Sequence, residues 1–347
     1  MIWKTLPWLA GVTVLAVGVA AALVAREERS VAGATRVSEP FFPELAERPD
    51  AVEHLRISTA DYDLVLRRSG EAWLAENMGG YPVKGSDVSR VVNSLAFLRT
   101  FEPKTDDPAL YPAIQVEPPG QEGARSALVS AEGPDGEPLA EAVIGMASSS
   151  IGFNPRGGTF LRRPDEARAW LVEGRIDLPG TKAEWFEPIV HIPGNEVRRV
   201  AILSGETMLL DAVKQQDEAG TYRLAYLADR FSKPGVVPNQ SGIKRIGLGI
   251  VSTEFEAARP AAEVDFSGET RSIRFETQDG LVLEVRIAEA DGASWVGYEA
   301  SAKGGSAGAA KAAEIRARTE NWAFRLPEHR LAPLLVNVED LIQPAAP

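Results

Sequence analysis

The sequence predicts an α+β fold: an N-terminal transmembrane helix followed by two similar modules, each a mainly antiparallel β-sheet with a helix packed on one face. Three observations lead to this prediction. Leu6–Ala25 is an apolar segment without a charged side chain. Beyond it, short runs of alternating apolar and polar residues are interrupted by a helical pattern. The order of these patterns recurs after about 150 residues, which is typical of an internal repeat.

The apolar segment reads LPWLAGVTVLAVGVAAALVA. At about 1.5 Å per residue, a helix of roughly twenty residues spans about 30 Å, the thickness of a bilayer core. We therefore interpret residues 1–26 as a signal anchor in the lipid bilayer. This makes the chain a single-pass protein of the cell inner membrane, with its bulk in the periplasm. The alternative is a cleaved signal peptide, although the apolar region of such a peptide is usually only about 7–15 residues long. Either interpretation exports Arg26–Pro347.

Residues 27–50 contain prolines and charges with little periodicity, and they predict a Pro-rich stalk. The first module is predicted over residues 51–196. Alternation predicts its strands, and helical spacing after Ser86 predicts a helix whose apolar stripe covers one face of the sheet. The predicted strands are Glu53–Ser58, Tyr62–Arg67, Ala72–Glu76, Ser126–Ala131, Leu139–Ile144, Thr159–Arg163 and Ala169–Val172, and the apolar helix positions are Val88, Val91, Val92, Leu95 and Leu98.

The second module is predicted over residues 197–343, as a probable internal repeat of the first. Short matches between the halves keep the same order: Leu55–Ser58 with Val200–Leu203, Ser86 with Ser241, Phe101-Glu102 with Phe255-Glu256, and Trp170–Val172 with Trp322–Phe324. Ser241 is expected to open a second helix over Ile243–Ile250, which Gly247 and Gly249 weaken. Ala302–Ala313 is rich in Gly, Ala and Ser, and it predicts a loop.

Composition excludes several functions. The formal net charge of −12 disfavours nucleic acid as a partner, because the phosphate backbone would be repelled. The chain has no cysteine, so disulfides, thiolate nucleophiles and Cys-ligated metals are excluded. The three histidines, His54, His191 and His329, lie far apart without a metal-ligand spacing. We predict no catalytic, cofactor-binding or metal-binding residue, no cofactor, and no enzymatic activity.

A few segments superficially suggest chemistry. Asp61/Asp63 and Asp106/Asp107 are paired carboxylates, but general acid–base catalysis needs a desolvated member, and both pairs lie near predicted turns. Gly304–Lys311 lacks the lysine directly after the last glycine that a phosphate-binding loop requires. His191 lies in an apolar stretch and is expected in the core or at an edge. The tryptophans of the exported part are expected to be core anchors: Trp73, Trp170, Trp185, Trp295 and Trp322.

Several stretches of the first module resemble a known bacterial family. They are Phe41–Leu45, Gly70–Trp73, Gly80–Pro82, Phe101–Thr105 with Tyr111, Gly158–Arg162, and Trp170–Val172 with Trp185. Spread over about residues 41–205, they are similar to the domain of unknown function 4340 family. Members look like single-span exported proteins associated with gliding-motility-type ABC-transporter components. The resemblance implies an auxiliary role and supplies no catalytic residue.

Together these observations predict a membrane-anchored, exported auxiliary or interaction subunit, with inner-membrane ABC-transporter-like components as partners and Leu6–Ala25 in the bilayer. The alternative is an exported lipid- or glycan-binding protein with its site between the two modules. An apolar pocket between the modules larger than about 300 Å³ would favour that alternative, and a filled junction would count against it.

Overall fold

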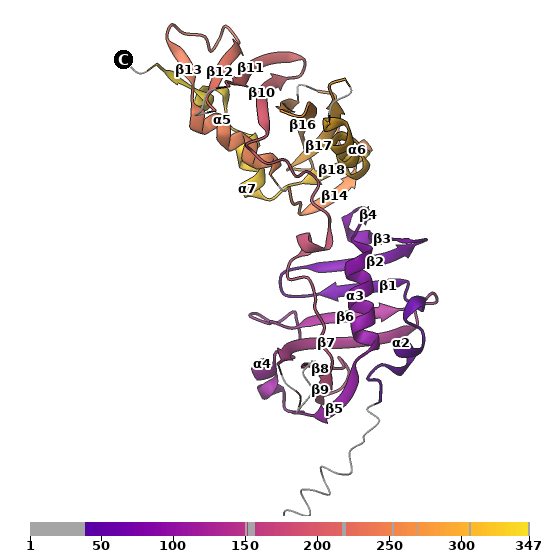
Figure 1. The fold of residues 1–347 in the computed structure, drawn as a ribbon. Helices are drawn as coiled ribbons and strands as arrows, with labels where there is room; N and C mark the ends of the chain where they lie inside the picture. Colours follow the sequence, from indigo (N-terminus) through magenta and orange to yellow (C-terminus); the bar gives the residue numbers. More distant parts are fainter. Residues whose placement is uncertain are drawn as a thin grey trace, which may run out of the picture.

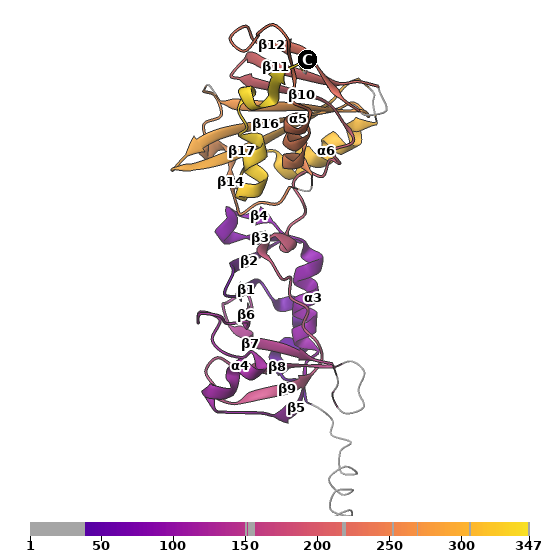
Figure 2. The same cartoon turned by 90° about the vertical axis from the view of Figure 1, so that its left-hand side faces the viewer.

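The computed structural model describes residues 39–149, 151, 157–216, 220–251, 253–268, 270–304 and 307–345. The predicted membrane span Leu6–Ala25 and the predicted stalk up to residue 38 lie outside these residues. The described chain is elongated, because two β-sheet modules are stacked end to end (Figures 1 and 2). Residues 174–196, which include the short 3-10 helix Lys182–Trp185, connect the strand that ends at Glu173 to the first strand of the second module.

The first module is a nine-stranded sheet in the order β4-β3-β2-β1-β6-β7-β8-β9-β5, and every neighbouring pair is antiparallel. Helix α3 (Gly85–Ala96) lies along one face, between the β4 end and the β5 end (Figure 1). Two shorter helices are α2 (Pro43–Glu47) and α4 (Tyr111–Ile114). The strands are β1 (His54–Ser58), β2 (Asp63–Ser69), β3 (Ala72–Ala75), β4 (Tyr81–Pro82), β5 (Arg99–Pro103), β6 (Ala127–Glu132), β7 (Pro138–Ser148), β8 (Gly158–Arg162) and β9 (Ala169–Glu173).

Helix α3 forms where apolar residues recur at helical spacing, and that stripe is buried against the sheet: Val88, Val91, Val92 and Leu95. Asp87 in its first turn is also buried, and Lys84 and Arg90 both form ion pairs with it. A carboxylate in the first turn also faces the positive end of the helix dipole. The predicted helix of the first module is therefore confirmed, with its N-terminus at Gly85.

The second module is an eight-stranded antiparallel sheet in the order β12-β11-β10-β15-β16-β17-β18-β14, with a separate two-stranded sheet β13-β19. Its helices are α5 (Gln240–Ile246), α6 (Gly308–Thr319) and α7 (Glu328–Leu331). The strands are β10 (Val197–Ser204), β11 (Thr207–Lys214), β12 (Tyr222–Leu227), β13 (Val236–Pro238), β14 (Ala257–Pro260), β15 (Arg271–Thr277), β16 (Leu281–Ala290), β17 (Ala293–Ala302), β18 (Trp322–Arg325) and β19 (Ile342–Pro344).

The two large sheets have the same strand order if β10 is matched with β1 and each later strand with its counterpart. The chain also enters the two modules alike. The Phe41 amide donates to the Leu98 carbonyl at 2.8 Å, and the Ile192 amide donates to the Ile250 carbonyl at 3.2 Å. One pairing differs: β4 pairs with β3, whereas its counterpart β13 pairs with the C-terminal strand β19. The duplication itself stays a prediction, and this common topology is what supports it.

The α+β fold class is wrong, because the described residues form mostly antiparallel sheets, 19 strands in three sheets, with few helices. None of these helices is long and apolar enough to cross a membrane, so the transmembrane element is not part of the described fold. The predicted second helix ends at Ile246 and continues as the short 3-10 helix Gly247–Ile250. Part of the predicted loop Ala302–Ala313 instead belongs to α6, because alanine and long straight side chains after Gly308 favour helix.

Candidate functional site

The junction between the modules is filled by aromatic rings, which we call the junction cluster: Tyr81, Phe186, Phe255, Trp322 and Phe324. Tyr81 in β4 lies at its centre, with ring centroids 5.0 Å from Trp322, 5.1 Å from Phe255 and 5.4 Å from Phe324. The Tyr81 hydroxyl donates to the Arg318 carbonyl in α6 at 3.0 Å. Burial raises the pKa of Tyr81 to about 12, and the nearby Arg318 charge opposes the rise.

The backbone also approaches closely at this junction. Gly79 has a φ of +65°, and a side chain there would meet the Ala258 carbonyl and the Arg259 Cα at about 3.0 Å. The β4 end of the first sheet therefore packs directly against strand β14 of the second. A filled junction counts against the lipid or glycan site that the alternative prediction placed between the modules.

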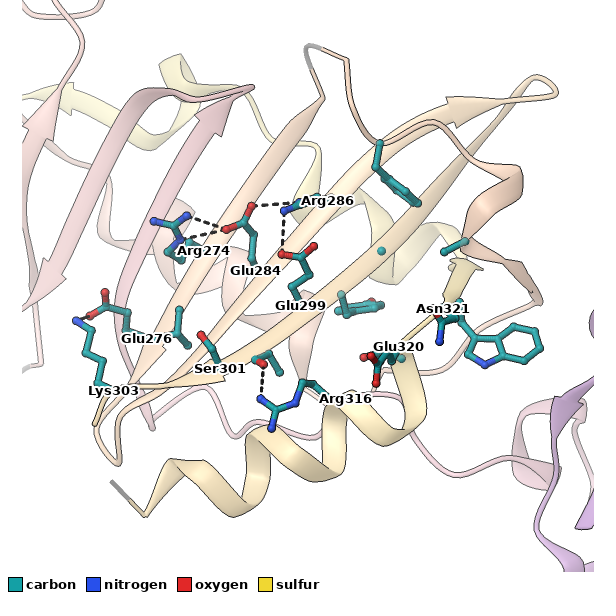
Figure 3. A pocket seen from close by; sticks show the side chains of 18 residues that line it. Arg274, Glu276, Glu284, Arg286, Glu299, Ser301, Lys303, Arg316, Glu320 and Asn321 are labelled. Atoms are coloured by element: carbon teal, nitrogen blue, oxygen red, sulfur yellow. Dashed lines mark hydrogen bonds and ion pairs between the residues drawn. The ribbon is translucent and has the colours of Figure 1, made fainter. Parts of the chain in front are cut away.

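A hollow of about 660 Å³ lies instead within the second module, on the outer face of β15, β16 and β17 beside α6 (Figure 3). We call it the groove. Its charged and polar lining residues are Arg274, Glu276, Glu284, Arg286, Glu299, Ser301, Lys303, Arg316, Glu320 and Asn321, and Phe266, Val282 and Trp322 are among its apolar ones.

Strand alternation explains why charges collect there. In β15 and β16, Ile273, Phe275, Leu283 and Val285 are fully buried against the core. The residues between them point to the opposite face, because successive side chains of a strand alternate. Antiparallel register then aligns the rows: Arg274 is opposite Glu284, and Glu284 is opposite Glu299.

The groove charges are matched by ion pairs across the strands. Arg274 Nη2 lies 2.8 Å from Glu284 Oε2. Arg286 bridges two acids, with Nε 3.3 Å from Glu284 Oε1 and Nη2 2.8 Å from Glu299 Oε2 (Figure 3). Burial raises the pKa of Glu284, but hydrogen bonds and charges from Arg274 and Arg286 outweigh it and lower the pKa below its usual value. Arg286 therefore neutralises two carboxylates that the register places directly opposite each other.

A second row of ion-paired side chains continues from the groove across the sheet to β10 and β11. Lys303 Nζ lies 2.7 Å from Glu276 Oε2, and the other oxygen of Glu276 lies 3.4 Å from Arg199 Nη1. Arg199 in β10 also holds Asp211 in β11 with two hydrogen bonds, of 2.7 Å and 2.6 Å. Asp211 is almost fully buried, and the hydrogen bond with this carboxylate raises the pKa of Arg199.

Helix α6 and a loop form the two sides of the groove. Strand β17 pairs with β18 at Val296 and Phe324. Further along β17, Arg316 of α6 donates a hydrogen bond to the Ala300 carbonyl at 3.0 Å. On the other side Phe266 covers the strand at Gly297, where a side chain would lie about 3.2 Å from its ring. The α6 side of the groove carries Arg316 within the helix and Glu320 and Asn321 directly after it, as Figure 3 shows.

The segments that suggested chemistry do not converge on the groove. Asp63 pairs with Arg56 at 3.1 Å, Asp106 pairs with Arg168 at 2.5 Å, and Asp107 caps a short helix. His191, expected in the core or at an edge, is exposed and lies outside the core, in the segment between the two sheets. Trp185 is fully buried, whereas Trp322 is half-buried at the groove. Across the described part of the chain, no group of three potential ligands could hold a metal ion.

Three of the four acidic side chains in the groove, Glu276, Glu284 and Glu299, are ion-paired with arginine or lysine. A general acid would need a raised carboxyl pKa, and that of Glu284 is lowered. This geometry suits binding of a polar, charged surface better than proton transfer.

No protein-family model matches this chain, and no curated protein matches it. The resemblance to the domain of unknown function 4340 family therefore stays a prediction.

Replacing Arg286 with Met is expected to leave Glu284 and Glu299 facing each other without their shared cation. Like charges directly opposite each other destabilise a sheet by up to about 1 kcal/mol, so the free energy of unfolding should fall by about that amount at pH 7. The lowered pKa of Glu284 gives stability that is present above its unfolded pKa and lost as the pH falls through its folded pKa. The deficit of R286M should therefore shrink in acid, which urea unfolding at pH 7 and at acidic pH measures.

The matched control for this prediction is Arg56→Met, which removes an exposed pair in the first sheet. Its effect should be at most about 0.5 kcal/mol and should not depend on pH in the same way. A deficit of R286M equal to that of R56M at every pH would contradict the role assigned to Arg286.

Proposed function

We propose that this chain is an exported, non-enzymatic binding subunit that holds a segment of a partner protein in the groove of its second module. The observation that carries the proposal is the row of alternating guanidinium and carboxylate groups, Arg274, Glu284, Arg286 and Glu299, held by ion pairs across three strands. Side chains that are already ordered lose little entropy when a partner binds, so such a surface can contribute to affinity and specificity.

The lining of the groove favours a polypeptide over a lipid. Lipid chains need a mostly apolar pocket, whereas eight of the groove residues are charged: Arg274, Glu276, Glu284, Arg286, Glu299, Lys303, Arg316 and Glu320. A partner segment with both acidic and basic side chains could replace water around these pairs. Its apolar residues could contact Phe266, Val282 and Trp322.

The proposed partner follows from the family resemblance. We take inner-membrane ABC-transporter-like components as the proteins that present this segment, and the periplasm as the place where it happens. The elongated two-module shape supports this assignment, because a filled junction fixes the groove at a set distance from the first module.

Site-specific photocrosslinking in cells tests the proposal. A benzophenone amino acid replaces Ser301, which is exposed in the groove, and in a matched variant it replaces Thr207, which is exposed at the start of β11 in the same module. We expect Ser301 to capture a transporter-type component that Thr207 does not. Charge reversal at Glu284 should reduce that product. Identical products from both positions, or none from Ser301, would contradict the proposal.

A further inference from the structure

Each sheet has two different ends, one at β4 or its counterpart β13 and the other at β5 or its counterpart β14. The junction between the modules uses one end of each kind. It joins the β4 end of the first module to the β14 end of the second (Figure 1). Because both sheets have the same strand order, the described residues leave one end of each kind outside the junction. These are the β5 end of the first module, which corresponds to β14, and the β13–β19 end of the second, which corresponds to β4.

The β5 end exposes two aromatic rings. Phe97 is 75% exposed and Phe101 is 39% exposed. Phe255 is the counterpart of Phe101 in the sequence match of Phe101-Glu102 with Phe255-Glu256, and it is only 4% exposed because Tyr81 and Phe186 cover it. The matched ring is therefore buried where a module packs on it and 39% exposed at the β5 end.

The entry segment of the first module covers part of this end. Residues 39–41 pair with the first part of β5, through a bond from the Thr100 amide to the Glu39 carbonyl at 3.0 Å and a bridge between Pro40 and Arg99. Within the described residues these bonds reach as far as Thr100, and the Phe101 ring next to it is 39% exposed. Glu39 is exposed and acidic, whereas the exposed Glu102 forms an ion pair with Lys104 at 2.9 Å.

The β13–β19 end of the second module has a hollow with an apolar lining. It has a cavity of about 360 Å³, which we call the end cavity, lined by the apolar residues Phe231, Val236, Ile342 and Pro344. Its polar lining residues are Arg230, Lys233, Glu339 and Gln343, so two cations and one carboxylate face it. Both cations belong to a turn with exposed residues. The four apolar lining residues can receive an exposed phenylalanine ring.

We propose that copies of this chain join head to tail, with Phe97 and Phe101 of one copy packed against the end cavity of the next. The contact joins the same two kinds of sheet end as the junction within one chain, with the inserted rings now on the β5 end. It is heterologous, so each added copy keeps one free end of each kind, and assembly continues beyond a dimer.

Sedimentation velocity of the full-length chain over a concentration series tests this proposal. We expect the wild type to grow past a dimer as its concentration rises, and the double variant F97E/F101E to lose this growth. Met146→Glu is the matched control, because Met146 is as exposed as Phe101 at 39% but lies on β7, away from both ends. Association through any other segment would be the same in all three proteins.

A mixing experiment distinguishes this contact from a symmetric one. F97E/F101E keeps an intact end cavity, and the variant R230E/K233E keeps intact phenylalanines. Mixed together, they should form a one-to-one dimer and nothing larger, whereas a symmetric contact would not be restored. The proposal is overturned if the wild type stays monomeric or if the mixture forms no dimer. It is also overturned if F97E/F101E loses binding to phospholipid vesicles but associates like the wild type.

Discussion

Replacing Tyr81 with Ala is expected to uncouple the two modules. The residue is 3% exposed, and its ring contacts four other aromatic rings of the junction cluster. Removing a large buried aromatic side chain typically costs about 3–5 kcal/mol. Because these contacts cross from one module to the other, we expect calorimetry of Y81A to show two separated unfolding transitions where the wild type shows coupled unfolding.

The control for this prediction is Tyr81→Phe. This variant keeps the ring and loses only the hydrogen bond from the hydroxyl to the Arg318 carbonyl, which should cost about 1 kcal/mol. Amide hydrogen exchange gives a local measurement, since amides of β4 and β14 should exchange faster in Y81A but not in Y81F. Equal stability and equal exchange in the two variants would show that the ring does not couple the modules.

The result also bears on how a partner would be held. If the junction is rigid, the groove and the β5 end keep a constant separation, and a partner that contacts both is bound without a further cost of ordering the modules. If Y81A loosens the junction, affinity for such a partner should fall even though no groove residue has changed. A partner held by the groove alone would not respond in this way.

Local patterns in the sequence were sufficient for elements whose periodicity is self-contained. The stripe from Val88 to Leu95 predicts α3 because a helix buries residues three and four apart whatever it packs against. The alternation at Leu139–Ile144 likewise predicts β7, although the strand extends to Ser148. The fold class could not be reached this way, since a helix was expected in each half and the sheets dominate both modules.

The second helix and α6 show what local patterns miss. Gly247 and Gly249 each cost a helix about 1 kcal/mol relative to alanine, and at Gly249 a side chain would meet Leu334. The helix therefore gives way to a tighter turn after Ile246. Helix α6 could not be predicted from the sequence, because its Gly- and Ala-rich start resembles a loop. Its residues Ala312 and Ile315 are buried in the core through tertiary packing, which local patterns do not show.

The groove could not be predicted, because its charges come together only through strand register. Arg274, Glu284 and Glu299 lie on three different strands, and shifting one strand by a single residue would turn its charges to the other face. The available signal was the placement of Arg and Glu at alternate positions within β15 and β16. That pattern indicates an outer face of a strand but not which charges meet.

The most severe loss of stability in the second sheet is expected from replacing Arg199 with Met. Arg199 holds Asp211 through two short hydrogen bonds, and the Asp211 side chain is only 4% exposed. Removing one partner of a buried ion pair leaves an uncompensated charge and typically costs about 3–5 kcal/mol. The same change removes one of the two cations at Glu276, so the row that leads to the groove is weakened as well. Urea unfolding at pH 7, followed by far-UV circular dichroism, measures the loss.

The double variant R199M/D211L separates the buried charge from the packing around it. Replacing both members of a buried pair with apolar residues of similar size is often neutral, so we expect most of the stability lost in R199M to return. Glu276 keeps Lys303 in both variants, at 2.7 Å, and its remaining pair is therefore the same in the two proteins. If the double variant is as unstable as R199M, the loss comes from the packing of the Arg199 side chain on the sheet and not from an unpaired Asp211. If the free energy of unfolding of R199M falls by less than about 1 kcal/mol, the pair behaves as a solvent-screened surface ion pair. In that case the pair does not stabilise the row of charges that leads to the groove.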